Sequence, residues 1–582
     1  MNYMSIVRHI SLILSCLGFL INPVHSTEID QSLSLKQQGQ PVLSKKWMVS
    51  AANPYAAKAG AEILAKGGSA ADAMVAVQTV LGLVEPQSSG IGGGAFLLWF
   101  DAASGKIITL DGRETASRHV TSKLFQDKTG EPLKFYSAVV GGRSVGVPGI
   151  PALMLEAHRR WGKLEWPALF KDGINLAKSG FVVSPRLAIL VARDQKRLSQ
   201  FATTARYFFP NGKPIVTGQI LKNSSYAETL AAIASDKGYS FYNGKIAQNI
   251  VSTVQSAAGN PGKLDQVDLK EYRVKERPAV CLDYRGYNVC GMGPPSSGGL
   301  TVGQILGTLE PYNLREMGHE SIEAWRLIGD ASRLAFADRG RYMADSDFVP
   351  VPVKGLLDRG YLKGRATLLN RTLALEEVLP GNPTFEISTH FADDQSKELP
   401  STSHISIVDQ YGNALSMTTT IENVFGSRLM TNGGFLLNNQ MTDFSFRSHK
   451  DGVPIANRVE PLKRPRSSMA PTILLKNGRI ALVIGSPGGS RIIGYVAQAI
   501  IAHVDWDMNA QQAVSMPHLV NRFGTFDLEK GTTAEVMARQ LKEKGFKVKV
   551  RGMNSGLHAI VINNSGLMGG ADPRREGVVI GN

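Results

Sequence analysis

Alternating apolar and polar residues fill the stretch from residue 399 to 421 and predict a β-hairpin. The run Ile405-Ser406-Ile407-Val408-Asp409 alternates, Gly412-Asn413 supplies a turn, and a second run continues from 414 to 421. Period-two alternation around a Gly-Asn turn is typical of two antiparallel strands. Thr402 therefore stands at the start of a strand. The charged loop before it, residues 392–398, is expected to be exposed or mobile.

The rest of the chain alternates between strand and helix patterns, which indicates an α/β fold. Expected strands cover residues 47–52, 96–100, 107–111, 472–476, 480–484, 546–550 and 558–562. Expected helices cover residues 54–66, 70–84, 321–342 and 491–503, and the region 152–277 is expected to be largely helical. Asn53 with Pro54, and Ser69 with Asp72, are helix-start signals. The helix 70–84 is small and apolar on almost every side and should be buried.

Composition is that of a soluble globular protein. The 582 residues are 43% hydrophobic and 19% charged, which allows a substantial core and argues against wholesale disorder. Length alone does not separate several domains from one α/β body. The net charge of +15 is spread over scattered Lys and Arg residues, so we favour a solvated basic surface over a nucleic-acid site.

The first 26 residues are expected to be an export signal. Arg8 and His9 precede an apolar run over 10–21, and the small Ser26 follows Val24 by two positions. A dozen apolar residues are too few to span a bilayer comfortably, so cleavage after Ser26 is preferred to a retained anchor, and lipidation at Cys16 is the weaker alternative. The mature protein is then periplasmic or secreted, without stable membrane insertion.

Two cysteines remain after this leader, Cys281 and Cys290. The residues between them predict a hairpin whose two-residue loop, Arg285-Gly286, places the cysteines opposite each other. In an exported protein such a pair is expected to be oxidised. A metal site is the weaker alternative, because two ligands without a neighbouring Cys or His do not complete one.

Thr402 is the first candidate for chemistry. A threonine hydroxyl is a weak nucleophile that needs a base, and cleavage of the Ser401-Thr402 bond would provide one in the new α-amine of Thr402 itself, with an ordinary pKa near 8. Taken alone, the local sequence favours an ordinary strand-capping threonine, and only the other motifs change that preference. The glycine run 90–94 does not supply a nucleotide site, because a helix precedes it and a strand follows, the reverse of the dinucleotide-binding order.

Several motifs, in one order, together resemble the γ-glutamyltranspeptidases, which are N-terminal-nucleophile hydrolases. They are Ser89-Gly90-Ile91-Gly92-Gly93-Gly94, Asp111-Gly112-Arg113-Glu114, Pro294-Pro295-Ser296-Ser297-Gly298-Gly299, Thr402-Ser403-His404, Asn438-Asn439-Gln440-Met441-Thr442-Asp443, Arg464-Pro465-Arg466-Ser467-Ser468 and Gly485-Ser486-Pro487-Gly488-Gly489. The resemblance implies a four-layered αββα sandwich built jointly by two self-cleaved chains. These would be a large subunit, 27–401, and a small catalytic subunit, 402–582, in one intertwined body.

Ten residues are assigned roles from their own chemistry together with the resemblance. Thr402 would be the nucleophile, Gly488 and Gly489 would form the oxyanion hole with backbone N–H groups, and Thr420 would bond to Thr402. Thr420 and Glu422 are expected on one strand and one face. Recognition of a γ-glutamyl group would fall to Arg113, Ser467 and Ser468 at its α-carboxylate, and to Asp443, Gln440 and Glu422 at its α-ammonium. No metal or cofactor is implied.

The leading function is therefore γ-glutamyl transfer and hydrolysis, with a glutathione-like donor and water, an amino acid or a peptide as acceptor. Two features depart from the family pattern. Glu422 stands where many members have an asparagine, and the segment 444–463 is short and has no tyrosine, whereas some members have a longer lid that carries one. A cephalosporin (glutaryl) acylase of the same family is the alternative enzyme, against which Asp443 and Glu422 argue. An uncleaved exported binding protein is the alternative of another class.

Overall fold

Two seven-stranded sheets form the centre of the protein. The structure is a computed structural model that describes residues 28–385, 390–394, 396 and 401–582, so the expected export signal lies outside the described residues. The first sheet has the order β21 (Val578–Gly581), β2 (Met48–Ala51), β10 (Ser403–Val408), β11 (Ala414–Thr420), β3 (Gly94–Asp101), β4 (Lys106–Gly112) and β7 (Lys275–Arg277). The second has the order β1 (Val42–Ser44), β20 (Gly566–Ala571), β19 (His558–Asn563), β15 (Arg479–Gly485), β14 (Thr472–Lys476), β9 (Tyr287–Gly291) and β8 (Val280–Tyr284).

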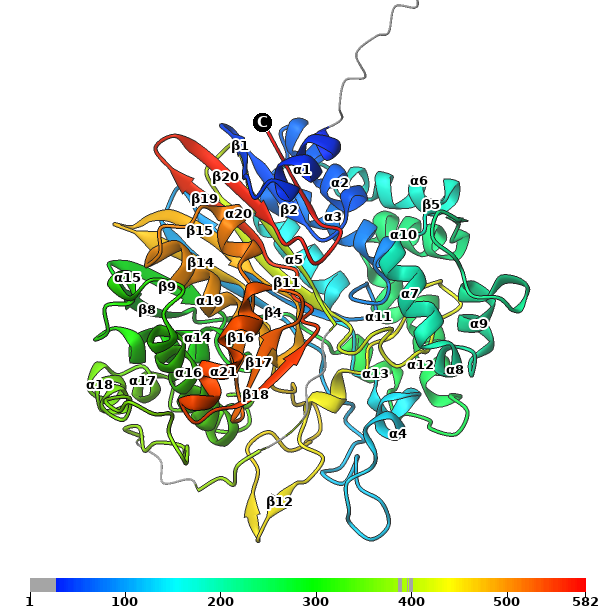
Figure 1. Ribbon diagram of the computed structural model, residues 1–582. Coiled ribbons are helices and arrows are strands. Elements are labelled where there is room, and N and C mark those ends of the chain that lie inside the picture. The colour runs from blue at the N-terminus through cyan, green and yellow to red at the C-terminus, as the bar shows by residue number, and fades with distance from the viewer. Residues whose placement is uncertain (1–27, 386–389, 395, 397–400) are drawn as a thin grey trace, which may run out of the picture.

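The sheets pack face to face, and helices cover both outer faces (Figure 1). The first sheet is covered by α2 (Pro54–Ala65), α3 (Ala70–Val84) and α5 (Ile150–Trp161). The second is covered by α14 (Gly298–Leu309), α19 (Ile492–Val504) and α20 (Ala510–Ser515), with α16 (Ile322–Tyr342) packed on α14. This is the expected four-layered αββα sandwich.

Strand β3 shows how the sequence pattern creates the layers. Leu97 and Trp99 belong to the apolar core under the helices of the first sheet, whereas Phe96, Leu98 and Phe100 belong to the core between the two sheets. Successive side chains of a strand point to opposite faces, so a strand buried on both faces reads as one continuous apolar run. All five side chains are at most 5% exposed.

The predicted hairpin of β10 and β11 lies in the middle of the first sheet. Ser403 pairs with Thr419 and Val408 with Ala414 in one antiparallel register. Strand β10 also pairs with β2, and β11 with β3, both from the part of the chain before Thr402. Cleavage before Thr402 would therefore leave two chains joined through shared strands, as the two-subunit prediction requires.

Most predicted elements and caps are confirmed. Asn53 caps α2 by accepting from the Tyr55 N–H, and Ser69 with Asp72 forms a reciprocal capping box at α3. The strand expected at 546–550 is also present, as β18 (Lys547–Arg551), which pairs with β17 (Thr525–Glu529) in a separate three-stranded sheet outside the sandwich.

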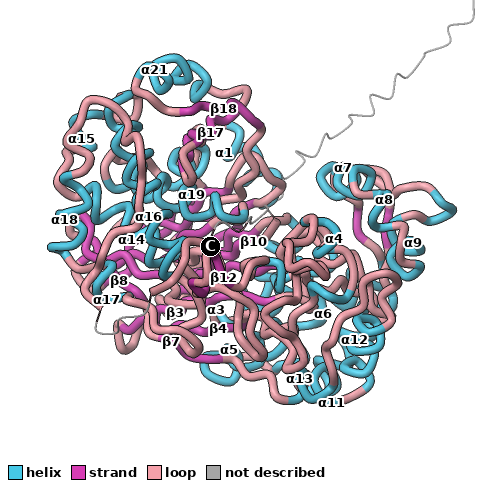
Figure 2. Tube along the Cα trace, turned by 90° about the horizontal axis from the view of Figure 1, so that it is seen from below, coloured by secondary structure: helices cyan, strands magenta, loops and turns pink. Residues whose placement is uncertain are grey.

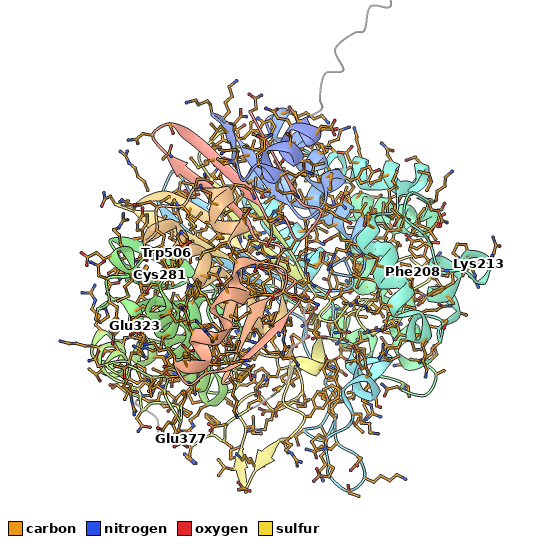
Figure 3. All side chains as sticks on the ribbon, in the orientation of Figure 1. Phe208, Lys213, Cys281, Glu323, Glu377 and Trp506 are labelled. Carbon is orange, nitrogen blue, oxygen red and sulfur yellow. A yellow bond between two sulfur atoms is a disulfide. The ribbon has the colours of Figure 1, made fainter. Side chains whose placement is uncertain are left out.

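A helical lobe lies beside the sandwich, on the right in Figure 1 and again in Figure 2. It contains α7 (Pro185–Arg193), α10 (Ser224–Asp236) and α12 (Lys245–Gln255), as the largely helical pattern of 152–277 predicts. In Figure 3, Phe208 and Lys213 mark this lobe, on the opposite side from Cys281 and Trp506. Across the described ranges, no helix is both long and apolar enough to cross a membrane.

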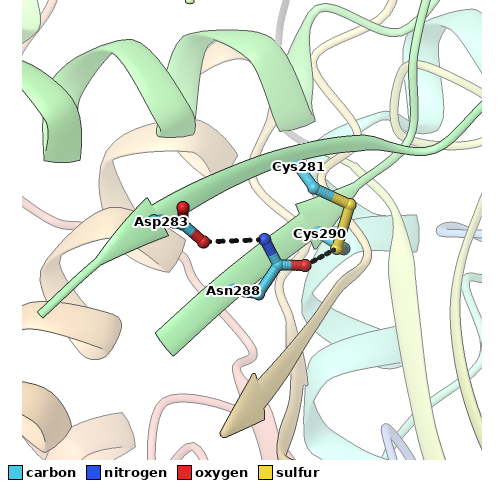
Figure 4. Close-up of a disulfide and its surroundings, with 4 residues drawn as sticks. All are labelled: Cys281, Asp283, Asn288 and Cys290. Carbon is cyan, nitrogen blue, oxygen red and sulfur yellow. Dashed lines mark hydrogen bonds between the residues drawn. A yellow bond between two sulfur atoms is a disulfide. The ribbon is translucent and has the colours of Figure 1, made fainter. Parts of the chain in front are cut away.

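The predicted disulfide is present between β8 and β9. Cys281 stands opposite Cys290 across the two-residue loop, and their sulfur atoms are 2.08 Å apart. Figure 4 shows the pair beside the hydrogen bond from the Asn288 amide to Asp283, which is 3.1 Å long. The disulfide ties together the hairpin of β8 and β9, which forms one edge of the second sheet.

Candidate active site

Thr402 immediately precedes β10, the third of the seven strands of the first sheet, and is 3% exposed. Its Oγ1 contacts the carbonyl oxygen of Ser401 and lies 3.2 Å from Oγ1 of Thr420. The Thr420 hydroxyl in turn lies 3.4 Å from the Ser401 carbonyl oxygen and accepts from the Glu422 N–H at 2.8 Å. A hydroxyl is thus held against the peptide bond that self-cleavage would break.

The predicted site residues lie around one cavity. Nine of the ten predicted site residues line this cavity. Ser401, the residue that precedes Thr402, lines it as well. These nine are Arg113, Thr402, Thr420, Glu422, Gln440, Asp443, Ser467, Ser468 and Gly489. The space open to water is about 20 Å³, far below the ~300 Å³ of a typical ligand pocket. In the uncleaved chain, the cavity is therefore closed to a γ-glutamyl group.

Arg113 and Asp443, assigned to opposite ends of the substrate, bind each other here. Nη2 of Arg113 donates to Asp443 at 2.6 Å and to the Arg466 carbonyl at 2.9 Å, and Nε donates to the Pro465 carbonyl at 3.2 Å. Gln440 donates to the same Asp443 oxygen at 2.6 Å. Three of the five guanidinium N–H groups are used within the protein, which fixes the plane of the guanidinium.

Glu422 lies in the cavity but not on the strand of Thr420. Strand β11 ends at Thr420, and Glu422 takes a left-handed backbone conformation with φ of 74°. The expectation that both residues share one strand and one face is therefore wrong. The turn instead carries the Glu422 carboxylate to the Asn439 amide, with which it forms a hydrogen bond. Glu422 is 4% exposed and lines the cavity together with Asp443.

The pair Ser467-Ser468 is held by two elements to which the sequence assigned no role. The Ser467 carbonyl accepts from both the N–H and the hydroxyl of Ser297, and the Ser468 hydroxyl accepts from Nη2 of Arg339 at 2.8 Å. Nε of Arg339 also donates to the Ser297 hydroxyl at 2.8 Å. The Pro-Pro-Ser-Ser-Gly-Gly motif and α16 therefore support the predicted carboxylate side of the cavity.

Gly488 and Gly489 form the turn between β15 and α19. Their φ angles are 141° and 60°, in the region that favours glycine. A Cβ on Gly488 would lie 2.7 Å from the Tyr495 ring, so the turn has no room for a side chain there. Gly489 lines the cavity, while Gly488 lies just behind it against Tyr495.

The loop before Thr402 is less exposed than its composition predicts. Asp394 is 7% exposed and pairs with Arg466 at 2.8 Å, and the Ala392 N–H donates to the Pro454 carbonyl. The expectation of a wholly exposed or mobile loop is wrong for these residues, because the buried Arg466 guanidinium needs a carboxylate partner.

The described residues of 444–463 form only a short hairpin, β12 (His449–Lys450) with β13 (Val453–Pro454), which projects at the bottom of Figure 1.

Glu114 is a residue of the site that sequence reasoning left without a role. Its Oε2 lies 3.9 Å from Nη1 of Arg113, and the side chain is completely buried. Burial raises the pKa of Glu114 to about 8, although Arg113 opposes the shift. Its position next to Arg113 in the Asp-Gly-Arg-Glu motif is the signal that pointed to it. The neutral acid leaves the Arg113 charge for Asp443 and for a ligand.

Two face-to-face sheets between helices, with a threonine hydroxyl at the head of a central strand, define an enzyme fold of the N-terminal-nucleophile hydrolase class. The particular family follows from the match of residues 56–582 to the family model described as Gamma-glutamyltranspeptidase. The chain belongs to that family.

Its relatives include enzymes of both kinds weighed from the sequence. The chain is 35% identical over 571 residues to the glutathione hydrolase proenzyme of Bacillus subtilis (strain 168), covering 96% of this chain and 95% of that one. It is 34% identical over 540 residues to the acylase ACY 1 proenzyme of Pseudomonas sp. (strain SE83), covering 91% and 92%. The crystal structure of cephalosporin acylase from Bacillus halodurans matches with a TM-score of 0.82 at 26% identity, covering 93% and 97%.

Proposed function

We propose that this protein hydrolyses and transfers γ-glutamyl groups, with Thr402 as an N-terminal nucleophile. Activation would begin with attack of the Thr402 hydroxyl oxygen on the Ser401 carbonyl carbon. The carbon–nitrogen bond breaks, the nitrogen takes the hydroxyl proton, and an ester forms. Water then hydrolyses the ester to a Ser401 carboxylate and a Thr402 with both hydroxyl and α-amine free. The contact between Thr402 Oγ1 and the Ser401 carbonyl group supports this step.

Cleavage also supplies the room that the closed cavity lacks. Ser401 lines the cavity in the uncleaved chain, and its departure would free the space beside Arg113 and Asp443. The products would be the large chain ending at 401, beginning at 27 if the export signal is removed, and the small chain 402–582. They would remain one heterodimer through the shared strands.

The ion pair between Arg113 and Asp443 carries the choice of substrate. A γ-glutamyl group presents an α-carboxylate and an α-ammonium on one carbon, so it can insert between the two side chains with each charge matched. Arg113, Ser467 and Ser468 would take the carboxylate, and Asp443, Gln440 and Glu422 the ammonium. Thr402 would attack the γ-carbonyl carbon while Gly488 and Gly489 stabilise the oxyanion, and the carbon–nitrogen bond would break to release the donor's amine, which takes the Thr402 hydroxyl proton through the α-amine. Water, an amino acid or a peptide would then accept the acyl group from the γ-glutamyl ester and free the Thr402 hydroxyl.

A glutaryl acylase is the second candidate, favoured by the similarity to an acylase proenzyme and to a cephalosporin acylase structure. A glutaryl group has a carboxylate but no ammonium, and would leave Asp443 and Glu422 without a cationic ligand. A γ-glutamyl ammonium would add an opposite charge beside these two carboxylates, which a glutaryl group cannot do. The charges of the cavity therefore favour the γ-glutamyl substrate.

The test compares γ-glutamyl and glutaryl anilides as substrates of the wild type and of Asp443→Ala. Losing the Asp443 carboxylate strands the substrate ammonium, so kcat/KM should fall hundreds- to thousands-fold, or about 3 to 5 kcal/mol, for the γ-glutamyl substrate and far less for the glutaryl one. Asp194→Ala is the matched control, because Asp194 also pairs with a buried arginine, Arg428, but outside the cavity. Equal losses on both substrates, or a wild-type preference for glutaryl amides, would replace this function by the acylase.

A further inference from the structure

A buried arginine from the C-terminal end of the chain contacts the residue proposed as nucleophile. Nη1 of Arg575 donates to the backbone carbonyl oxygen of Thr402 at 2.7 Å. Arg575 is 4% exposed and lies in the turn between β20 and β21, more than 170 residues after Thr402. Arg575 does not line the cavity.

The contact matters because Thr402 lies outside the regular strand ladder. The pairing of β10 with β11 begins at Ser403. A buried backbone carbonyl needs a donor, and for Thr402 the donor is a charged guanidinium. This hydrogen bond fixes the peptide plane from which the Thr402 side chain and nitrogen extend. Cleavage would remove the covalent anchor on the other side of Thr402, so the bond would then matter more.

The same guanidinium reaches the segment behind the glycine turn. Nε of Arg575 donates to the Asn554 side chain at 3.1 Å. The backbone oxygen of Asn554 lies 3.6 Å from where a Cβ on Gly488 would stand. Arg575 therefore links the proposed nucleophile to the support of the proposed oxyanion hole.

A buried carboxylate of the large proposed chain, Glu85, attracts Arg575, whereas Arg186 of the same chain repels it. Glu85, which ends α3 and is completely buried, accepts from the Ser403 hydroxyl at 2.8 Å and attracts Arg575. Arg186 of α7 lies 3.9 Å from Glu85, and its backbone N–H donates to Glu576 at 3.1 Å. Burial, and then Arg186, lower the pKa of Arg575 to about 9, which leaves it charged at neutral pH.

We propose that Arg575 is a positioning residue for Thr402, which orients its peptide group and places a positive charge beside the α-amine that cleavage creates. The charge would keep this amine neutral, and therefore active as the base, to lower pH than an ordinary α-amine. The inference rests on the proposed function. The charged side chains that line the cavity with Thr402 are Arg113, Glu422 and Asp443, and those that act on Arg575 behind it are Arg186, Glu85 and Asp572, with the buried phenol of Tyr495 beside them.

The experiment measures kcat, KM and the acidic limb of kcat/KM against pH for mature wild type, Arg575→Gln and Arg575→Lys. Nη1 of Arg575 contacts the Thr402 carbonyl oxygen at 2.7 Å, and only three covalent bonds separate that oxygen from the Thr402 nitrogen, so the charge is close enough to shift the pKa of the amine by about one unit. Removing the charge should raise the pKa of the amine, so the acidic limb of Arg575→Gln should move up by about one unit. KM should stay within about twofold, since no cavity residue changes.

Arg575→Lys separates charge from geometry. Lysine keeps the charge, so its limb should stay within about 0.3 unit of the wild type, but it cannot bind Thr402 and Asn554 as a fork, so kcat should fall about tenfold. The matched control is Arg326→Gln, another buried arginine, which is 2% exposed and paired with Glu323 in α16. It should leave the limb in place.

Several outcomes would overturn the proposal. One is an unmoved limb in mature Arg575→Gln, and another is the same upward shift in Arg575→Lys. If Arg575→Gln does not mature, the proposal is refuted by an Arg575→Lys variant whose kcat and maturation rate equal those of the wild type. If neither variant matures, a wild-type acidic limb above pH 8 decides against it, because the ordinary α-amine titrates near 7.7. An active Thr402→Ala would instead refute the proposed function, a separate result.

Discussion

Replacing Glu114 by glutamine tests whether a neutral carboxylic acid stands behind Arg113. Burial raises the pKa of Glu114 from 4.5 to about 8 in the folded protein. The folded state then holds a proton that the unfolded chain loses above pH 4.5, so stability is lost as pH rises from 4.5 through 8. At pH 7 the cost is about 3 kcal/mol, from ~1.4 kcal/mol per pH unit over 2.5 units.

Glu114→Gln should remove this cost, because the amide is nearly isosteric with the neutral acid. Its thermal midpoint should match the wild type near pH 4 and exceed it increasingly between pH 4.5 and 8. Activity gives an independent reading: above pH 8 the wild-type carboxylate ionises 3.9 Å from Arg113 and competes with the substrate carboxylate, so KM should rise there in the wild type and not in the variant.

The control is Glu543→Gln, whose side chain is 65% exposed on the surface and should give no pH-dependent difference. A stability difference between Glu114→Gln and the wild type that stays constant from pH 4 to 9 would refute the reasoning, since it would show that Glu114 does not gain a proton on folding. So would an alkaline rise in KM that survives the substitution.

Three further predictions address maturation and stability. Thr402→Ala should remain one chain and be inactive, which a denaturing gel and an anilide assay check; cleavage at the same bond in that variant would contradict the mechanism. Thr420→Val should slow self-cleavage at least tenfold on a gel time course, because it removes the hydroxyl 3.2 Å from Thr402 Oγ1, and an unchanged rate would count against this contact. Reducing the Cys281–Cys290 bond should cost no more than about 3 kcal/mol and leave activity nearly intact, because the closed loop is short; a large loss of activity in the Cys281→Ser, Cys290→Ser double variant would disagree.

Local patterns in the sequence predicted the layers of the fold well. The alternation of 405–409, the caps at Asn53 and Ser69, and the two-residue loop between the cysteines each depend on neighbours within a few residues, and each is present. The placement of β18 in a separate sheet depends on pairing with β17, about twenty residues earlier. No periodicity within 546–550 contains that information.

In the site, too, local motifs were predictable from the sequence, whereas contacts between distant residues were not. The motifs identified which residues line the cavity, because each motif carries its own chemistry. Their mutual contacts were beyond the sequence: Arg113 binds Asp443 across 330 positions, and Arg339 reaches Ser468 from a helix whose pattern reads only as packing. Glu422 was misplaced for a local reason, because alternation continues past Thr420 while the backbone turns left-handed at Glu422.

The most direct test of the account is a mass measurement on mature protein quenched during turnover of a γ-glutamyl anilide. The account predicts two chains, with the small one beginning at Thr402, and a mass increase of one γ-glutamyl group on the peptide that starts with Thr402. The label should disappear when an amino acid acceptor is added. A single intact chain that turns over the substrate, or a label on any other residue, would contradict Thr402 as the nucleophile.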